Sequence, residues 1–431
     1  MSWTIRNHLE CGEDGYLKIG GVDALELAEK YGTPLFVINE QRVRKRFREF
    51  LGALKKRYEK VKVCYAVKAN PSLAILKILK EEGAGFEVVS EYELLSALRI
   101  GAKPEDIVFN GANKSQEELE LAVKKGILIN VDSLSELEKL EKISKRLNRL
   151  ANICIRVNPG VKVRTHRDLV AGAEYSHFGI HIPEARKAFE RAAGSKHISL
   201  KGVHMHIGSQ ITSTRPFVFA INRIFRLLAD LSKSGIKLGL VDLGGGLGVE
   251  YEGEHPPTAE EYAEAVISAV KSNVKKYGLS EPLLIFEPGR YILADAGVCL
   301  LKVGVVKRTP DGSKWVIVDG GSNILLRAAM GVYRFKMILA NKAVMKPRER
   351  VNIAGPLCFG GDVIGRNVRL PPVEEGDILA VFCAGAYTTS LSHQYNMRPR
   401  PPIVLVSNGR HRLIREAEQY RDLIARDIVQ K

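Results

Sequence analysis

The chain has 431 residues, which is too long for one ordinary hydrophobic core, so a large barrel with a second domain is expected. Its content of 45% hydrophobic and 26% charged residues is typical of a soluble globular protein, and no apolar run approaches the roughly 18 residues of a membrane span. The net charge of +16 arises from Lys and Arg that are interleaved with Glu along stretches such as 117–125 and 135–149, which indicates solvated helix faces. We therefore expect no nucleic-acid partner and no membrane partner, while an anionic substrate or an acidic protein partner stays open.

Two further features narrow the class of protein. Residues 1–10 lack the apolar core of a signal peptide, so a cytoplasmic location is expected. The six cysteines form no Cys-x-x-Cys pair, which argues against a zinc site or a disulfide framework and indicates that most of them are buried as small hydrophobic residues. They are Cys11, Cys64, Cys154, Cys299, Cys358 and Cys383.

The chain reads as three segments. Residues 1–40 contain one amphipathic helix, 22–31, and are expected to pack with the C-terminal domain. Residues 41–290 alternate short β-branched runs with amphipathic helices, which predicts a parallel (β/α)8 barrel, with a doubly wound sheet as the competing layout. The expected strands are 61–67, 85–89, 106–109, 127–131, 152–157, 200–207, 238–243 and 283–286, and the expected helices are 72–82, 91–100, 115–125, 133–149, 183–193, 217–233 and 258–277.

Residues 291–431 have a different texture. Short β-branched runs at 298–306, 314–318, 350–353, 377–382 and 403–406 lie between Gly, Pro and Asp turns, with little helical periodicity. This pattern predicts a C-terminal antiparallel β domain.

The unusual residues of the barrel segment fall at the ends of the predicted strands, where barrel enzymes place their active sites. Lys68 follows an apolar strand, so its ammonium would face the barrel mouth with poor solvation, a setting that favours Schiff-base chemistry; an exposed charge is the alternative. Gly244, Gly245 and Gly246 expose backbone N–H groups that suit a phosphate, or else form a flexible turn. Arg290 would add a charged donor beside them.

Two other groups have more than one interpretation. Glu287 is a natural partner for a cationic ring nitrogen, or a buried partner for Arg290. His204 and His206 are two residues apart on a strand and so face one side; with no third ligand at a sensible spacing, we expect no metal and favour an imidazole stacked on a flat cofactor ring.

Taken together, these motifs resemble the fold-type III pyridoxal-phosphate decarboxylases, most closely the diaminopimelate decarboxylase family, over nearly the whole chain. The matching motifs are YAVKAN at 65–70, HMHIGSQ at 204–210, LGGGLG at 243–248, EPGR at 287–290, GPLC at 355–358, AGAY at 384–387 and YNMRPRP at 395–401. The resemblance implies conversion of meso-diaminopimelate to L-lysine and CO2 with pyridoxal 5'-phosphate (PLP) as the cofactor, in lysine biosynthesis.

The resemblance also implies roles for individual residues. Lys68 would form the internal aldimine, His206 would stack on the pyridine ring, and Glu287 would pair with the ring nitrogen. Tyr387 would close over cofactor or substrate. The residues implied around the phosphate are Ser209, Gly244, Gly245, Gly246, Gly289 and Arg290, and those implied for the substrate are Arg290, Arg327, Tyr333, Phe359 and Tyr387.

Cys358 is the implied proton donor, and in this family it reaches the site from the second subunit of a homodimer, which implies shared active sites. Its place in a Gly-Pro turn fits a projecting loop, and a buried structural thiol is the alternative.

Several departures from the family pattern concern the substrate. Phe359 stands where the family has a Glu for the distal amino group, and Gly331 stands where it has a Tyr for the distal carboxylate, with Tyr333 nearby as a substitute. His177 and Glu87 replace the more usual Lys and Asp. Loss of the carboxylate would cost about 1.5–3 kcal/mol of recognition. The alternatives are therefore a decarboxylase acting on another α-amino acid, free or carrier-tethered, an amino-acid racemase, or a non-catalytic cofactor-binding protein.

Overall fold

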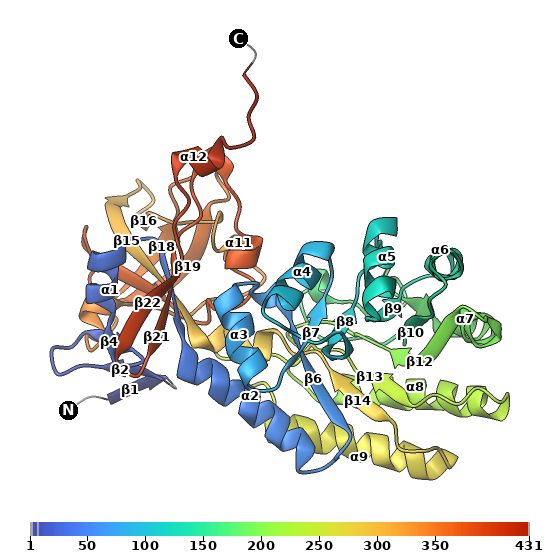
Figure 1. Cartoon of the computed structure of the whole chain (residues 1–431). Helices are drawn as coiled ribbons and strands as arrows, with labels where there is room; N and C mark the ends of the chain where they lie inside the picture. The colour runs from blue at the N-terminus through green and yellow to red at the C-terminus, as the bar shows by residue number, and fades with distance from the viewer. Residues whose placement is uncertain (1–2, 7, 430–431) are drawn as a thin grey trace. The chain divides into compact units, whose positions relative to one another are not determined.

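The computed structural model describes residues 3–6 and 8–429 in two compact units. The barrel unit comprises residues 46–249 and 254–292, and the β unit comprises residues 1–45, 250–253 and 293–431. Figure 1 gives the labels of the elements.

The barrel unit is built on eight parallel strands that close on themselves. They are β6 (Val61–Ala66), β7 (Gly85–Val88), β8 (Ile107–Phe109), β9 (Leu128–Val131), β10 (Ala151–Asn158), β12 (Ile198–His204), β13 (Leu240–Asp242) and β14 (Leu283–Phe286), with a short β11 (Ile180–His181) beside the end of β10. Each strand pairs in parallel with its neighbour, and β14 pairs with β6, where Leu284 lies opposite Val61. The predicted (β/α)8 barrel is confirmed, and the doubly wound alternative is wrong because that sheet would have open edges.

Helices surround these strands (Figure 1). They are α2 (Glu40–Lys55), α3 (Leu73–Glu81), α4 (Glu91–Arg99), α5 (Gln116–Lys125), α6 (Leu134–Leu147), α7 (Ile182–Gly194), α8 (Arg215–Lys233), α9 (Ala259–Tyr277) and the short α10 (Arg290–Leu293), with 3-10 turns η1 (Val67–Ala69), η2 (Pro104–Asp106) and η3 (Arg167–Leu169). Capping boxes begin α5 at Ser115 and α9 at Thr258, and left-handed Gly126 and Gly278 end the same helices. These signals explain why the helix boundaries were readable from the sequence.

Helix α2 was missed by the sequence analysis. It is dense in Arg and Lys, yet Val43, Phe47, Phe50 and Leu54 recur at helical spacing and are all buried. Phe50 stacks on Tyr262 of α9 with ring centroids 5.7 Å apart. The helix is therefore part of the outer layer of the barrel.

The β unit contains a large mixed sheet and a small antiparallel one. The large sheet has the order β19-β18-β16-β15-β5-β21-β22, and β20 pairs with β15 and β17. Its strands are β5 (Leu35–Asn39), β15 (Gly297–Arg308), β16 (Lys314–Val318), β17 (Met337–Leu339), β18 (Glu349–Ala354), β19 (Val363–Leu370), β20 (Ile378–Val381), β21 (Ile403–Ser407) and β22 (Arg410–Arg415). Most pairs are antiparallel, as predicted, whereas β16–β18 and β5–β21 are parallel.

The N-terminal segment belongs to this unit, because β5 pairs with β15 and β21. The small sheet consists of β1 (Trp3–Arg6), β2 (Leu9–Cys11), β3 (Leu17–Ile19) and β4 (Val22–Asp23), and the short helices of the unit are α1 (Ala24–Tyr31), α11 (Leu326–Ala329) and α12 (Tyr420–Leu423), with 3-10 turns η4 (Ala294–Ala296), η5 (Ala340–Lys342), η6 (Thr389–Leu391) and η7 (Tyr395–Met397). The helix expected at 22–31 begins at Ala24 because the Asp23 carboxylate accepts the Leu25 N–H and caps it.

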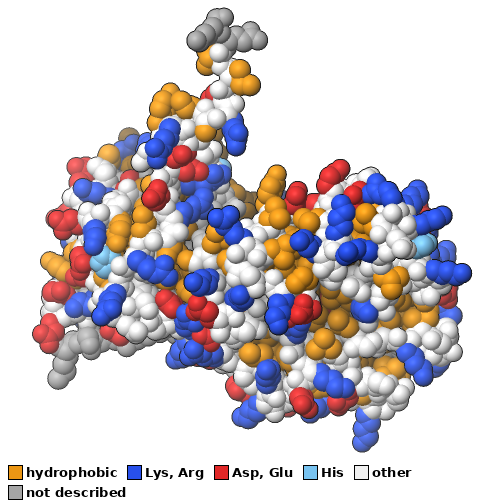
Figure 2. All heavy atoms as spheres, in the orientation of Figure 1, with side chains coloured by type: hydrophobic (Ala, Val, Ile, Leu, Met, Phe, Trp, Pro, Cys, Tyr) orange, Lys and Arg blue, Asp and Glu red, His pale blue; other side chains and the backbone are white. Residues whose placement is uncertain are grey.

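The surface and the cysteines agree with the expectations from composition. Figure 2 shows Lys and Arg interspersed with Asp and Glu over the face in view. Of the six cysteines, Cys358 is exposed and the other five are buried. Among the residues that the structure describes, no helix is both long enough and apolar enough to cross a membrane.

The close approach of β12 and β13 gives a prediction. A Cβ on Gly202 of β12 would lie 2.0 Å from the Leu240 carbonyl oxygen, whereas a Cβ on Gly239 would meet no atom within 4 Å. We expect Gly202→Ala to lower the free energy of unfolding by about 1–3 kcal/mol, because the sheet must shift to admit the methyl group. The control, Gly239→Ala, should have the same melting temperature as the wild type. Equal melting temperatures for Gly202→Ala and Gly239→Ala would contradict the close packing of β12 on β13.

Candidate active site

A layer of polar side chains fills the C-terminal end of the barrel interior. The apolar layer below it includes Cys64, Val108 and Ile285, packed with Leu128 and Leu240. Because side chains alternate along a strand, the residue two positions further on faces the same interior. Those positions in four of the five strands hold Asn110, Asn130, Asp242 and Glu287, all of them buried. The interior therefore changes from apolar to polar over two residues along each of these strands.

Lys68 lies at the edge of this layer, in the 3-10 turn that follows β6. Its ammonium contacts the buried carboxylate of Glu87, and the Lys68 side chain is 38% exposed. The side chain is therefore partly exposed, and its ammonium is paired with a carboxylate. The partner is Glu87 on the adjacent strand β7, whose side chain is fully buried.

An amide side chain connects this ion pair to Glu287. The Asn110 Nδ2 atom donates to Glu87 Oε1 at 2.9 Å and to Glu287 Oε1 at 2.8 Å. Asn130 Nδ2 in turn donates to Asn110 Oδ1 at 2.7 Å, which fixes the orientation of the Asn110 amide. Lys68 and Glu287, which are 219 positions apart, therefore belong to one hydrogen-bonded network.

His206 lies beside the glycine triplet. The Gly245 N–H donates to His206 Nδ1 at 3.2 Å, so that nitrogen is an acceptor and the ring proton is on Nε2. Loss of hydration, followed by the charges of Arg156 and Lys68, lowers the pKa of His206 to about 3. The ring is therefore neutral at physiological pH, and a neutral, flat imidazole suits stacking on another ring.

The glycine triplet packs against the two loops that follow β12 and β14. A Cβ on Gly244 would lie 2.5 Å from Met205 O, one on Gly245 would lie 2.2 Å from Glu287 O, and one on Gly246 would lie 2.3 Å from Gly208 O. Gly244 and Gly246 also have positive φ, at 65° and 115°. Glycine is thus required at all three positions by packing, which explains the triplet without invoking flexibility.

Arg290 is the charged residue among the candidates for phosphate binding. Its guanidinium is buried, and Nε and Nη2 donate to Ser209 Oγ at 3.3 and 3.0 Å. Within the described part of the chain, no backbone acceptor is recorded for the Gly246 N–H. A buried cation beside a glycine loop with an available N–H is the donor set that a phosphate needs, so these residues fit the phosphate of PLP. Gly289 precedes Arg290 in the same turn.

The five remaining candidates belong to the β unit. Cys358 is exposed, its N–H donates to Asn396 Oδ1 at 2.9 Å, and its carbonyl accepts from Tyr395 Oη at 3.4 Å. Phe359 beside it is 53% exposed. A buried carboxylate, Asp362, holds the base of this loop through the Leu357 N–H at 2.8 Å and also accepts the Ser322 N–H at 2.6 Å. The structure therefore supports the projecting loop and not the buried thiol.

The other β-unit candidates have distinct settings. Arg327 is half-buried on α11, and Gly331 follows that helix with a φ of 70°, a conformation that a Tyr would strain. Tyr333 is buried and stacks on Tyr251 with ring centroids 4.4 Å apart. Tyr387 has a φ of 56°, and such an uncommon backbone conformation in a non-glycine residue is typical of functional positions.

The sequence analysis missed Asn110, Asn130 and Asp242, and noted Glu87 only as a departure from a family pattern. The signal that identifies them is a polar residue two positions after an interior apolar residue of a barrel strand. Among the described residues, one group of His, Asp and Glu is close enough to share an ion: His204, Asp242 and Glu287, whose ligand atoms lie within 4.8 Å of one another. Amide N–H groups of Asn110 and Asn130 are directed at these carboxylates, which is the arrangement of a hydrogen-bonded cluster.

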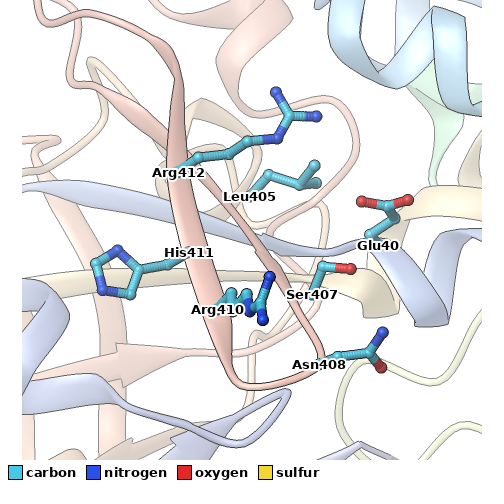
Figure 3. A pocket seen from close by; sticks show the side chains of 7 residues that line it. All are labelled: Glu40, Leu405, Ser407, Asn408, Arg410, His411 and Arg412. Atoms are coloured by element: carbon cyan, nitrogen blue, oxygen red, sulfur yellow. The ribbon is translucent and has the colours of Figure 1, made fainter.

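Two pockets lie away from these residues. One of about 600 Å³, in the β unit, is shown in Figure 3 and is lined by Glu40, Leu405, Ser407, Asn408, Arg410, His411 and Arg412. His411 is engaged there with the Tyr31 hydroxyl at 2.8 Å. Another of about 500 Å³ lies at the N-terminal end of the barrel strands, beside Leu128, Leu240 and Leu283. Neither pocket contains a sequence-predicted site residue.

The lowered pKa of His206 predicts a pH dependence. In the unfolded chain His206 binds a proton with a pKa of 6.5, whereas in the native protein its pKa is about 3. The free energy of unfolding therefore falls as the pH drops from about 6.5 to about 3. We expect His206→Gln to flatten the decrease in melting temperature of the cofactor-free protein between about pH 7 and pH 4. Substitution of the exposed His255 by Gln is the control. Parallel curves for His206→Gln and wild type would show that the pKa of His206 is not lowered in the native state.

Comparisons with known proteins agree with the fold and with this site. Residues 40–294 match the family model described as the pyridoxal-binding domain of pyridoxal-dependent decarboxylases. The chain is 41% identical to diaminopimelate decarboxylase of Bacillus subtilis and 39% identical to that of Methanothermobacter thermautotrophicus, in each case over 96% of both chains.

The structural comparison gives the same result. The crystal structure of diaminopimelate decarboxylase from Methanocaldococcus jannaschii, in complex with L-lysine, superimposes with a TM-score of 0.92 at 39% identity and covers 99% of both chains. The family resemblance seen in the motifs is thereby confirmed, as is the expectation of a PLP-dependent carboxy-lyase. The chain belongs to the diaminopimelate decarboxylase family of pyridoxal-dependent decarboxylases.

Proposed function

We propose that this protein converts meso-diaminopimelate to L-lysine and CO2. The observation that carries the proposal is the buried network that connects Lys68 through Glu87 and Asn110 to Glu287 beside the glycine triplet. An amine and a carboxylate joined by hydrogen bonds beside a glycine loop support cofactor binding at this end of the barrel, and the relatives with about 40% identity over 96% of the chain are diaminopimelate decarboxylases.

The barrel residues have distinct tasks in this proposal. Lys68 would bind the cofactor covalently, Glu287 would face its ring nitrogen, and neutral His206 would lie against its ring. Ser209, the glycine triplet, Gly289 and Arg290 would bind the phosphate, and Tyr387 would cover the cofactor or substrate. When bound, PLP supplies a sink for the electron pair that remains after the α-carboxylate leaves as CO2.

The β unit would complete the reaction. The bond from the α-carbon to the carboxylate breaks, CO2 leaves, and the α-carbon must then gain one proton. The exposed Cys358 Sγ is the proposed donor of that proton, since its loop is held by Asn396, Tyr395 and Asp362 in a defined conformation. Exposure of both Cys358 and Phe359 favours their use in a partner's active site, and we propose a cytoplasmic homodimer with shared sites.

The substrate's distal end is the open part of the proposal. Arg327 is retained and would bind the distal carboxylate, whereas Phe359 offers no charge to the distal ammonium. Tyr333 is buried against Tyr251, so its use as a substrate contact would need a rearrangement of that stacked pair. An α-amino acid with a different distal group is therefore the second candidate substrate. The presence of Cys358 in the GPLC motif favours decarboxylation over racemisation.

The proposed reaction predicts a labelled lysine and a specific product. After loading with PLP and reduction with borohydride, peptide mass spectrometry should place the cofactor on Lys68. The enzyme should release CO2 and L-lysine from meso-diaminopimelate, and Lys68→Ala should lose both signals, because the amine is removed. Lys62→Ala, on the strand β6 that precedes Lys68, is the control. A label on another residue would refute the site, and CO2 release only from other amino acids would refute the substrate.

Shared active sites predict complementation between two inactive variants. Lys68→Ala and Cys358→Ala should each be impaired when pure. After subunit exchange in an equal mixture, half of the dimers carry one intact site, so about a quarter of the wild-type activity should return. Failure to regain activity, while size measurements show exchanged dimers, would place Cys358 in the active site of its own subunit.

A further inference from the structure

Two titratable groups near Glu287, Asp242 and His204, have no part in the reaction as described so far. Asp242, Glu287 and His204 are buried, and one ligand atom of each lies within 4.8 Å of the others. Two carboxylates this close in a dry interior cannot both keep a negative charge without a cation between them. One of the two must therefore hold a proton when the protein is at neutral pH.

The hydrogen bonds decide which carboxyl is ionised. Glu287 Oε1 accepts from Asn110 Nδ2 at 2.8 Å, and Glu287 Oε2 lies 3.4 Å from His204 Nε2. Burial alone would raise the pKa of Glu287, but the neighbouring His204 and Lys68 outweigh burial and lower it. The negative charge thus resides on Glu287, which is also connected to Lys68 through Asn110 and Glu87.

Asp242 has the opposite setting. Its Oδ1 accepts the Gly244 N–H at 2.9 Å, but the Asn130 donor is 3.3 Å from Oδ2, which leaves that oxygen with a weak partner. Burial, and then the adjacent charge of Glu287, raise the pKa of Asp242 well above its ordinary value. A proton on Oδ2 is therefore retained, and Glu287 is an acceptor near it.

His204 supports this assignment. It is fully buried, and neither ring nitrogen has a partner with hydrogen-bond geometry among the described residues. Burial lowers the pKa of His204, so the ring is neutral, and its Nε2 faces Glu287. A neutral ring adds no positive charge, so the Glu287 anion is stabilised by the hydrogen bond from Asn110 and by the charge of Lys68.

We propose that Asp242 is a positioning residue that stays protonated inside the barrel and donates a hydrogen bond to Glu287, which keeps Glu287 anionic opposite the cofactor's ring nitrogen. The inference rests on the proposed function for the identity of the group that Glu287 faces. The proton on Asp242 itself is a property of the cofactor-free protein. It also explains why Asp242 precedes the glycine triplet, because one carboxyl group then orients both Gly244 and Glu287.

Infrared spectroscopy of the cofactor-free protein tests the proton directly. At about pH 8, above the pKa of about 7 to which burial raises Glu93, the wild type should show the carbonyl stretch of a protonated carboxylic acid. Asp242→Asn should lose this band. The control is Asp132→Asn, since Asp132 is also buried but is paired with Arg156 at 3.2 Å, and its removal should leave the band in place.

A second variant keeps the test decisive if Asp242→Asn fails to fold. Glu287→Gln removes the negative charge that raises the pKa of Asp242, so the band should disappear at a lower pH than in the wild type. A wild-type protein without the band, a band that survives Asp242→Asn, or an unchanged titration in Glu287→Gln would each overturn the proposal.

The loaded enzyme supplies an independent signal. With PLP labelled with 15N at the ring nitrogen, the wild type should show a protonated ring, and Asp242→Leu, which cannot donate a hydrogen bond, should shift the resonance toward the unprotonated form. An unchanged resonance in Asp242→Leu would overturn the proposed effect on Glu287. If PLP does not bind through Lys68 at all, the proposed function fails while the infrared band still reports on the buried pair.

Discussion

The interior of the barrel imposes one constraint on everything around it: a polar group placed there needs a partner, because water is excluded. The first interior layer contains Cys64, Val108 and Ile285, which are apolar and need no hydrogen-bond partner. The second layer brings together carboxyl, amide and imidazole groups from several strands. The amide groups of Asn110 and Asn130 donate hydrogen bonds within this layer, and the resulting network orients Glu287 and Glu87, the partner of Lys68, at the same time.

Close backbone packing maintains this arrangement. The glycine triplet contacts the loops that follow β12 and β14 so tightly that any Cβ would overlap a carbonyl group. As a result, the His206 ring, the Glu287 backbone and the glycine triplet are held in a fixed relation: Gly245 N–H contacts His206, and Gly244 O accepts from the Glu287 N–H at 2.9 Å. Precise placement of this kind is what a covalently bound, planar cofactor requires.

The β unit holds Cys358, the proposed proton donor, on a loop that is anchored by hydrogen bonds. The Cys358 loop is exposed at its tip but anchored at its base by Asp362 and at its side by Asn396. The same carboxylate of Asp362 also holds the backbone of Ser322, so the loop that precedes α11 and Arg327 shares its anchor with the thiol loop. The proton donor and the carboxylate-binding arginine of the proposed reaction therefore depend on one buried aspartate.

Much of this molecule was determined by the sequence alone. Hydrophobic periodicity predicted the parallel barrel, caps and terminal glycines predicted its helices, and the motifs around Lys68, His206, Glu287 and Cys358 predicted the family, because these signals are local along the chain. Helix α2 was missed because its charge obscured a clear apolar stripe. The partner of Lys68, the amide between Glu87 and Glu287, and the burial of Tyr333 against Tyr251 were decided only by the tertiary structure. Those contacts join residues from different strands and loops. The closure of the barrel and the packing of the sheet decide which side chain a buried residue meets, and a local sequence pattern contains no information about either.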